Sequence, residues 1–317
     1  MLFRFPLPTS FGYTGYYTNI GDMVNRGVEV ELSGDVIRTR DLTWNLYANL
    51  TSNHNEVTRL PEERRTQHYW DTDGNRYDGF SSGSYYYSEG LSAYSYMTHK
   101  FAGLDENGKS LWYKTVYKKG DDGKYIYEDE NETIKVFDHI ETTDNYSEAD
   151  DYIVGDIMPR VYGGFGTSLE WKGLDLGVNF AYQLGGKVYD STYASLMGNS
   201  AGRAMHEDLL NAWTPANTDS DIPRWQYNDT YMNGGSDRFL ISANYLSLQN
   251  ITLGYTLPKQ WTKKLHIEKI RIYGVADTVW VWSKRRGLDP RMALAGAINN
   301  TYYSPIRTIS GGISVTF

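Results

Sequence analysis

The sequence predicts an all-β protein, in which about seven or eight antiparallel strands form part of the wall of a transmembrane outer-membrane β-barrel with long extracellular loops. Three observations support this fold class. Apolar and polar residues alternate along several segments, short and long connections alternate along the chain, and the 317 residues include 28 Tyr, 9 Trp and 31 Gly. Alternation hides the apolar surface of barrel strands, so a hydrophobic share of 40% is compatible with a membrane.

The first two predicted strands cover residues 24–36 and 42–50. In the first, the even positions are mostly Val or Leu and the odd positions are mostly polar, with Arg26 as the exception. In the second, Leu, Trp and Ala alternate with Thr, Asn and Tyr. Because successive side chains of a strand point to opposite faces, each segment has one apolar face. Residues 38–41 form the hairpin turn between them.

The later strands repeat this pattern. They cover residues 161–171, 174–184, 240–257, 267–282 and 309–317, and residues 2–7 are a possible additional strand. A turn at residues 171–173 joins strand 161–171 to strand 174–184, and a turn at residues 258–266 joins strand 240–257 to strand 267–282. The pair formed by residues 240–257 and 267–282 alternates less regularly, which indicates a β-bulge.

The connections predict which end of the sheet faces the cell exterior. Three long connections, at about residues 56–158, 187–238 and 285–304, alternate with the short turns, so all long loops lie at one end. Outer-membrane barrels have short periplasmic turns and long external loops, and aromatic residues at both interfaces. Tryptophans near predicted strand ends fit such girdles; they are Trp44, Trp171, Trp280 and Trp282.

A soluble β-sandwich is the alternative, because its inner faces also alternate. Loops this long on one side only are unusual in a sandwich, since most connections have a few residues. Composition excludes other classes: the formal charge of −8 disfavours a nucleic-acid partner, and the lack of Cys excludes a disulfide scaffold. Residues 1–12 have no signal-peptide pattern, and no window has the roughly 18 consecutive apolar residues of a membrane helix.

Five motifs occur in order along the chain. They are NIGDMVNRGVE (19–29), FAGLDENGK (101–109), DIMPRVYGGF (156–165), YLSLQNITLGYTLP (245–258) and GLDP (287–290). Together they resemble motifs of SusC/RagA-like TonB-dependent outer-membrane transporters, over the C-terminal third of a family member only. The chain departs from the family at Thr278, where Asn is usual, at Arg285, where Tyr is usual, and at Arg291, where an acid is common.

The resemblance implies a location in the bacterial cell outer membrane and a role in TonB-energised import of glycans or peptides. It also implies that the chain is a fragment, because the family's plug, TonB box and earlier strands have no counterpart in it. Expected partners are therefore a SusD-like lipoprotein on the external face, the missing N-terminal plug and barrel portion of the same protein, and TonB only through that portion.

The sequence offers no catalytic or metal site. Its six His are scattered without His-x-x-x-His or His-x-His spacing, and Cys is absent. Residues 71–75 (DTDGN) are similar to the start of a calcium loop, but the Gly is fourth and no Glu stands at position twelve, so a polar turn is the better interpretation. We therefore expect no enzyme activity, no metal and no cofactor. A soluble sugar-binding module is the alternative function.

Aromatic residues of the long loops are the candidate contacts for cargo or partner. They could stack on sugars or hold a peptide backbone, or they could instead pack the loops onto one another. The residues are Tyr85, Tyr86, Tyr87, Tyr94, Tyr96, Trp112, Tyr113, Trp225, Tyr227, Tyr302 and Tyr303. The last strand ends on Phe317, and this ending resembles the signal that the barrel-assembly machinery reads.

Overall fold

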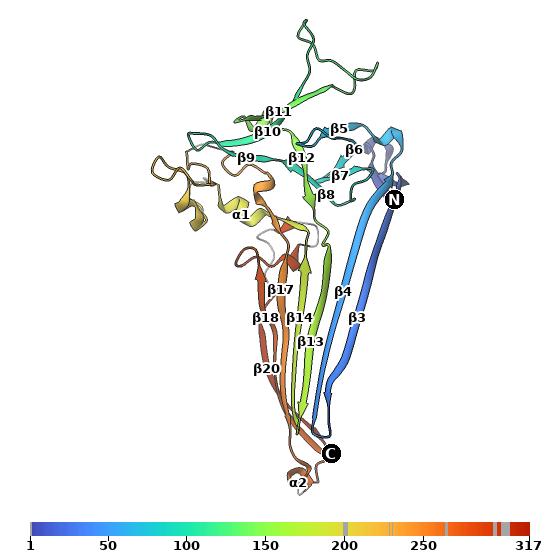
Figure 1. Cartoon of the computed structure of the whole chain (residues 1–317), viewed down its shortest axis with the longest axis vertical. Coiled ribbons are helices and arrows are strands. Elements are labelled where there is room, and N and C mark those ends of the chain that lie inside the picture. The colour runs from blue at the N-terminus through green and yellow to red at the C-terminus, as the bar shows by residue number, and fades with distance from the viewer. Residues whose placement is uncertain are drawn as a thin grey trace.

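A tall antiparallel sheet extends along the length of the molecule, and smaller sheets and short helices lie at one end of it (Figure 1). The structure is a computed structural model that describes residues 2–198, 202–227, 229, 231–263, 266–293, 297–298 and 305–317. The chain reaches its C-terminal end at the opposite end of the sheet from the small sheets (Figure 1). The fold is all-β, as the sequence predicts.

Seven strands form the tall sheet, which we call the wall. They are β3 (Asp22–Arg38), β4 (Leu42–Arg59), β13 (Val161–Trp171), β14 (Leu174–Leu184), β17 (Tyr245–Thr256), β18 (Lys269–Ser283) and β20 (Thr308–Thr316). Their order is β20-β18-β17-β14-β13-β4-β3. Each predicted wall strand is present, and the 11 residues of β13 and β14 match the roughly 9–11 that cross a bilayer as a tilted strand.

The register between neighbouring strands determines which residues share a face of the wall. Val178 of β14 lies opposite Thr167 of β13 and Ile251 of β17, on the apolar face. The next residue, Asn179, lies opposite Gly166 and Asn250 on the polar face. Because paired residues of antiparallel strands share a face, the wall has one continuous apolar side and one polar side.

The apolar face of the wall is exposed. Leu32 on β3 is 67% exposed and Ile313 on β20 is 68% exposed, and no sheet of the described residues packs against this face. In a soluble β-sandwich the same side chains would be buried between two sheets. The sandwich alternative is therefore wrong, and lipid hydrocarbon is the environment that suits this surface.

All three short connections lie at the C-terminal end of the wall (Figure 1). In the turn from β3 to β4, the hydroxyl of Thr39 accepts a hydrogen bond of 3.0 Å from the amide of Leu42. The turn from β13 to β14 has two residues, Lys172 and Gly173, with φ of +47° and +90°. Positive φ at both central positions suits the right-handed twist of a two-residue hairpin. The connection from β17 to β18 contains α2 (Lys259–Thr262).

The predicted bulge is confirmed in β17 and β18. The pairing of β17 with both neighbours shifts between Leu248 and Asn250, so Gln249 is the extra residue of the strand. On β18, Thr278 lies at the same point and has φ of +51°. Asn tolerates this conformation better than a β-branched residue does, which gives a physical reason for the Asn that is usual there in the resembling family.

The prediction of an eighth wall strand at residues 2–7 is wrong. Strand β1 (Leu2–Pro6) pairs only with β2 (Gly15–Asn19), in a separate two-stranded sheet. The predicted strand 240–257 is also divided, because β16 (Leu240–Ser242) joins β15 (Lys187–Asp190) and β19 (Ala297–Ile298) in a sheet outside the wall.

Two further sheets come from the connection between β4 and β13. The first has the order β12-β8-β7-β6-β5, with bounds Asp151–Asp156, Ser95–His99, Tyr85–Ser88, Arg76–Ser82 and Gln67–Trp70. The second has the order β11-β10-β9, with bounds Phe137–Thr143, Ser110–Tyr117 and Phe101–Leu104. We call these sheets, together with β15, β16 and the helices near them, the loop layer.

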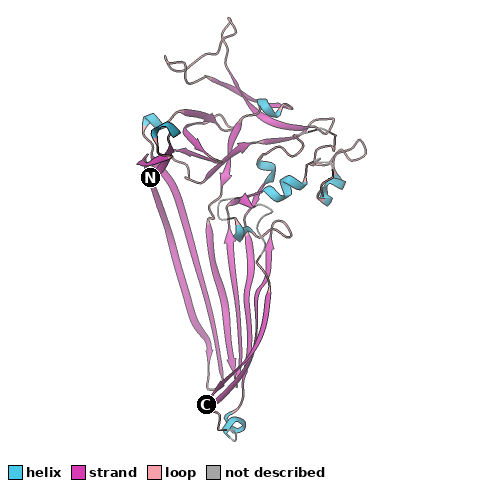
Figure 2. Cartoon of the chain, turned by 180° about the vertical axis from the view of Figure 1, so that it is seen from behind, coloured by secondary structure: helices cyan, strands magenta, loops and turns pink. Residues whose placement is uncertain are grey.

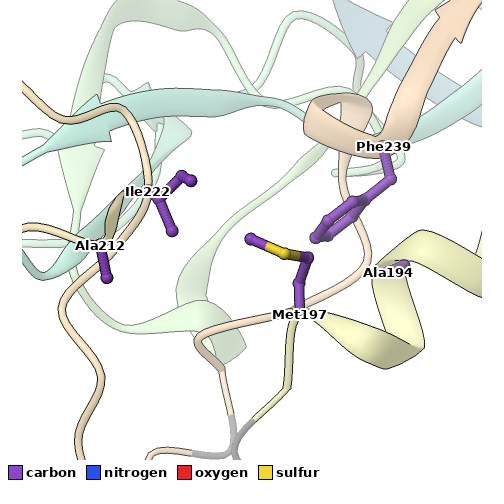
Figure 3. Packing of buried hydrophobic residues seen from close by; sticks show 5 residues of the cluster. All are labelled: Ala194, Met197, Ala212, Ile222 and Phe239. Carbon is purple, nitrogen blue, oxygen red and sulfur yellow. The ribbon is translucent and has the colours of Figure 1, made fainter. Parts of the chain in front are cut away.

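The helices are short, and all except α2 lie at the end of the wall opposite the short connections (Figure 2). None of those described is long and apolar enough to cross a bilayer. They are η1 (Thr9–Phe11), η2 (Glu62–Arg64), η3 (Tyr146–Glu148), α1 (Ser191–Leu196), η4 (Glu207–Asn211), η5 (Asp237–Phe239) and η7 (Pro290–Met292). Figure 3 shows a buried cluster in the loop layer, in which Met197 and Phe239 point toward one another.

Candidate functional site in the loop layer

Tyr86 of β7 is one of the candidate contacts, and it is fully buried. The single proton of its hydroxyl is shared between the carbonyls of Gln67, at 2.8 Å, and Tyr77, at 2.9 Å. Its ring meets Tyr69 edge to face, with 5.1 Å between centroids. Burial raises the pKa of the Tyr86 phenol well above its usual range. Tyr86 therefore joins β5 and β6 to β7 and has no free surface for a ligand.

Tyr96 and Trp112 are also buried by aromatic packing. Tyr96 stacks on Tyr189 at 6.2 Å between centroids, which ties β8 to β15. Trp112 meets the edge of Tyr146 at 5.1 Å, and Tyr146 stacks on Tyr231 at 5.0 Å. For these residues the structure supports the alternative that loop aromatics pack the loops onto one another.

Other candidates keep an accessible surface. Trp225 is 51% exposed and Tyr227 is 72% exposed, while Tyr94 is exposed to a smaller degree. Two more, Tyr85 and Tyr87, are half-buried on β7, and Tyr113 is half-buried on β10. Tyr302 and Tyr303 lie outside the described residues. The exposed subset, Tyr94, Trp225 and Tyr227, therefore remains as individual candidate contacts.

A cavity of about 780 Å³ lies beside the part of β4 that extends beyond the first residue of β13. Its walls include Asn53 and Asn55 of β4, Arg160, Lys187 and Asn244. Asn55 is buried and its amide nitrogen donates to Asn25 at 2.6 Å, so it is not available to a ligand. The other four side chains offer amide and cationic donors, which suit carbonyl, hydroxyl or carboxylate groups. Sequence reasoning missed this cavity because its residues come from four separate segments without a local motif.

Two half-buried carboxylates in the loop layer have structural partners. Asp150 accepts a hydrogen bond of 2.7 Å from the amide of Thr115, and Asp237 accepts one of 2.8 Å from the amide of Phe101. Desolvation raises the pKa of both carboxyls despite these bonds. Each acid holds two segments together, and no cluster of three or more potential metal ligands occurs among the described residues.

The polar face of the wall is built around glycines. Tyr47 of β4 extends over Gly166 of β13, and its hydroxyl hydrogen bonds to the side chain of Asn179 on β14. A Cβ at position 166 would lie 2.3 Å from the Tyr47 hydroxyl. Asp175 and Arg271 meet over Gly254 in the same manner, with Arg271 Nε 3.0 Å from the carboxylate. Long polar side chains thus lie flat against the sheet instead of projecting from it.

Similarity to known proteins extends over the whole chain. The chain is 25% identical over 341 residues to TonB-dependent receptor P3 of Formosa agariphila, and the alignment covers 100% of the chain and 31% of that receptor. It is 26% identical over 316 residues to TonB-dependent receptor SusC of Bacteroides thetaiotaomicron, covering 99% of the chain and 28% of SusC. The chain is a relative of the TonB-dependent receptors. No family model matches it.

Two solved structures share the fold. The RagAB peptide transporter matches with a TM-score of 0.74 and 26% identity, over 98% of the chain and 31% of the transporter chain. The closed-closed state of the RagAB peptide importer matches with a TM-score of 0.75 and 26% identity, over 100% of the chain and 32% of the importer chain. The chain thus spans about a third of the length of the relatives it matches.

These comparisons confirm three expectations from the sequence. They confirm the resemblance to SusC/RagA-like TonB-dependent receptors, the all-β barrel-wall fold, and the location in the bacterial outer membrane. The relatives are named as receptors and transporters and not as enzymes. The roles of the candidate contacts and of Phe317, which lies one residue beyond β20, stay predictions.

Two departures from the family have clear structural roles. Arg285 stacks on Tyr193, with its guanidinium carbon 3.3 Å from the ring centroid, and its Nε lies 3.0 Å from the buried carboxylate of Asp190. Arg291 binds both carboxylate oxygens of Asp289 and reaches the hydroxyl of Ser247 on β17 at 3.0 Å. Both arginines connect the 284–293 segment to other parts of the chain. In the sequence, only the departure from the family residue at each position indicated these contacts.

Proposed function

We propose that the chain forms part of the barrel wall and external loops of a TonB-dependent importer of the SusC/RagA type. The observation that carries the proposal is the two-sided wall, with a continuous exposed apolar face and a polar face lined by Asn, Gly and Tyr. An apolar outer side and a polar interior are the requirements of a membrane barrel that passes polar cargo.

The cargo we propose is a peptide or a glycan. Support comes from the similarity to the RagAB peptide transporter, from the amide and cationic groups in the cavity beside β4, and from the exposed aromatics Tyr94, Trp225 and Tyr227. Aromatic rings with nearby amide and cationic donors suit both sugar rings and peptide backbones. Residues 56–158, 187–238 and 285–304 would be the external loops.

The partners we propose are a SusD-like lipoprotein above the loop layer and the plug-bearing portion of the same protein inside the barrel. TonB would act only through that portion. Similarity to the RagAB peptide importer supports a lipoprotein partner for this chain. Phe317 would act as the assembly signal of the last strand.

Deletion of the gene that encodes the chain tests the proposal. Cells should lose uptake of at least one fluorescent oligosaccharide or oligopeptide, and the intact gene should restore it. A variant with Trp225→Ala and Tyr227→Ala should reach the membrane but import the affected cargo more slowly. Unchanged uptake of a broad panel of oligosaccharides and peptides after deletion would contradict the proposal.

A further inference from the structure

The end of the wall that bears the short connections is cationic. The connections at residues 39–41, 172–173 and 257–268 contain five Lys or Arg residues and two acids, although the whole chain has a formal charge of −8. Positive charge is therefore concentrated at one membrane boundary of an acidic protein.

Trp171 and Lys172 place part of this charge beside the apolar face. Trp171 is the last residue of β13 and lies opposite Leu42 and Leu174 on that face. The ammonium of Lys172 lies 5.9 Å from the centroid of the Trp171 ring. A lysine in this position can keep its stem on apolar surface and its charge at the level of lipid headgroups.

Helix α2 places a second Trp and two more lysines beyond the end of the wall (Figure 2). Trp261 is 61% exposed, and Lys259 and Lys263 on either side of it are exposed too. The apolar face continues to the base of this projection, where the amide of Leu257 donates to the carbonyl of Ile270 at 2.9 Å. Helix α2 thus begins two residues after the end of this face.

Two arginines at this end of the wall are paired with acids. Arg38 lies 3.2 Å from Asp35, and Arg271 binds Asp175. Within the described part of the chain, by contrast, Lys172, Lys259 and Lys263 have no acidic side chain within ion-pair distance. Their charge is available to an external anion.

We propose that Trp171, Lys172, Lys259, Trp261 and Lys263, which we call the basic rim, bind anionic phospholipids of the periplasmic leaflet through their phosphodiester headgroups. Interfacial Trp with flanking Lys is the composition of segments that lie in a membrane surface, and each Lys near anionic lipid adds a favourable electrostatic attraction. The inference concerns lipid selectivity and goes beyond the proposed import function.

One competing use of the rim is contact with protein inside the barrel. A cavity of about 530 Å³ on this end of the wall has Lys172, Lys269 and Arg271 in its lining, together with Glu170 and Asp175. An acidic protein segment could occupy it. Trp261, Lys259 and Lys263 do not line this cavity, so they distinguish lipid binding from protein contact.

Fluorescence quenching by brominated lipids tests the proposal. The protein is purified from outer membranes, with all the strands that accompany it there, and placed in phosphatidylcholine nanodiscs with a minor share of phosphatidylglycerol. Bromine is placed on the acyl chains of one lipid at a time. The difference in quenched fluorescence between the wild type and Trp261→Phe is the contribution of Trp261. We expect phosphatidylglycerol to be preferred at Trp261 by about fivefold or more, the effect of one lysine at an anionic surface.

Charge variants give the control. The triple variant Lys172→Gln, Lys259→Gln and Lys263→Gln should bring the preference close to one, whereas Lys118→Gln, Lys119→Gln and Lys124→Gln in the loop layer remove equal charge and should leave it unchanged. Equal quenching of wild-type Trp261 by both lipids overturns the proposal. So does a Trp261 that neither lipid quenches, since it would lie in water or against protein.

Discussion

Single side chains decide which face of the wall meets lipid. Val178 and Asn179 are neighbours at mid-strand in β14, and the register assigns them to opposite faces. Val178→Arg should sharply lower the amount of protein assembled in the outer membrane, because Arg at mid-bilayer costs about 2–4 kcal/mol on the lipid face. Asn179→Arg should be tolerated. Membrane fractionation with immunoblotting measures both. Equal levels would contradict this assignment of the faces, and a loss of Asn179→Arg alone would mean that the faces are reversed.

Glycine on the polar face provides a second residue-scale prediction. Gly166→Ala would place a Cβ 2.3 Å from the hydroxyl of Tyr47 and 2.7 Å from the carbonyl oxygen of Val178. Because the backbone oxygen cannot move away easily, we expect a loss of about 1–3 kcal/mol in the free energy of unfolding. Gly177→Ala is the matched control, since its nearest neighbour would be Thr252 Cβ at 4.0 Å. Urea unfolding in detergent should show a lower midpoint for the first variant only.

Arg285 acts at the scale of whole elements, because it joins the start of α1 to the segment after β18. Its partner Asp190 is buried and also accepts a hydrogen bond of 3.0 Å from the amide of Tyr193 at the helix start. Arg285→Met leaves this carboxylate without its cation, at a cost of about 2 kcal/mol. Limited proteolysis should cut residues 187–211 faster in this variant. Arg286→Met, at an exposed neighbour, should be cut as slowly as the wild type. Equal cleavage rates in all three proteins would contradict the role of Arg285 in joining α1 to the segment after β18.

Strand length explains which elements could be predicted. The wall strands have 9–18 residues, and over that length an alternation such as that of residues 174–184 is unambiguous. Strands β5, β7 and β9 have four residues each, too few for alternation to distinguish them from loops. Buried positions such as Tyr86 and Trp112 depend on contacts between segments distant in sequence, so composition alone could not separate them from the exposed Trp225.

At the scale of the whole molecule, the wall is an open sheet. Among the described strands, β3 and β20 each pair on one side only, so each presents a row of backbone amides and carbonyls without sheet partners. In hydrocarbon each such group costs several kcal/mol, and membrane sheets therefore close into barrels. The length of the relatives, about three times that of the chain, is consistent with additional strands that close the sheet.

The open edges lead to a prediction about the 317 residues expressed alone. Without strands to pair with β3 and β20, the chain should associate through its edges or stay outside the bilayer, and it should not restore uptake to cells that lack the importer. Hydrogen exchange in detergent should be fast at the outward-facing amides of β3 and β20 and slow in β14, which is paired on both sides. Addition of the strands that precede the chain in a full-length relative should protect both edges together. A monomer whose β3 edge amides exchange as slowly as those of β14 would show that the sheet closes on itself.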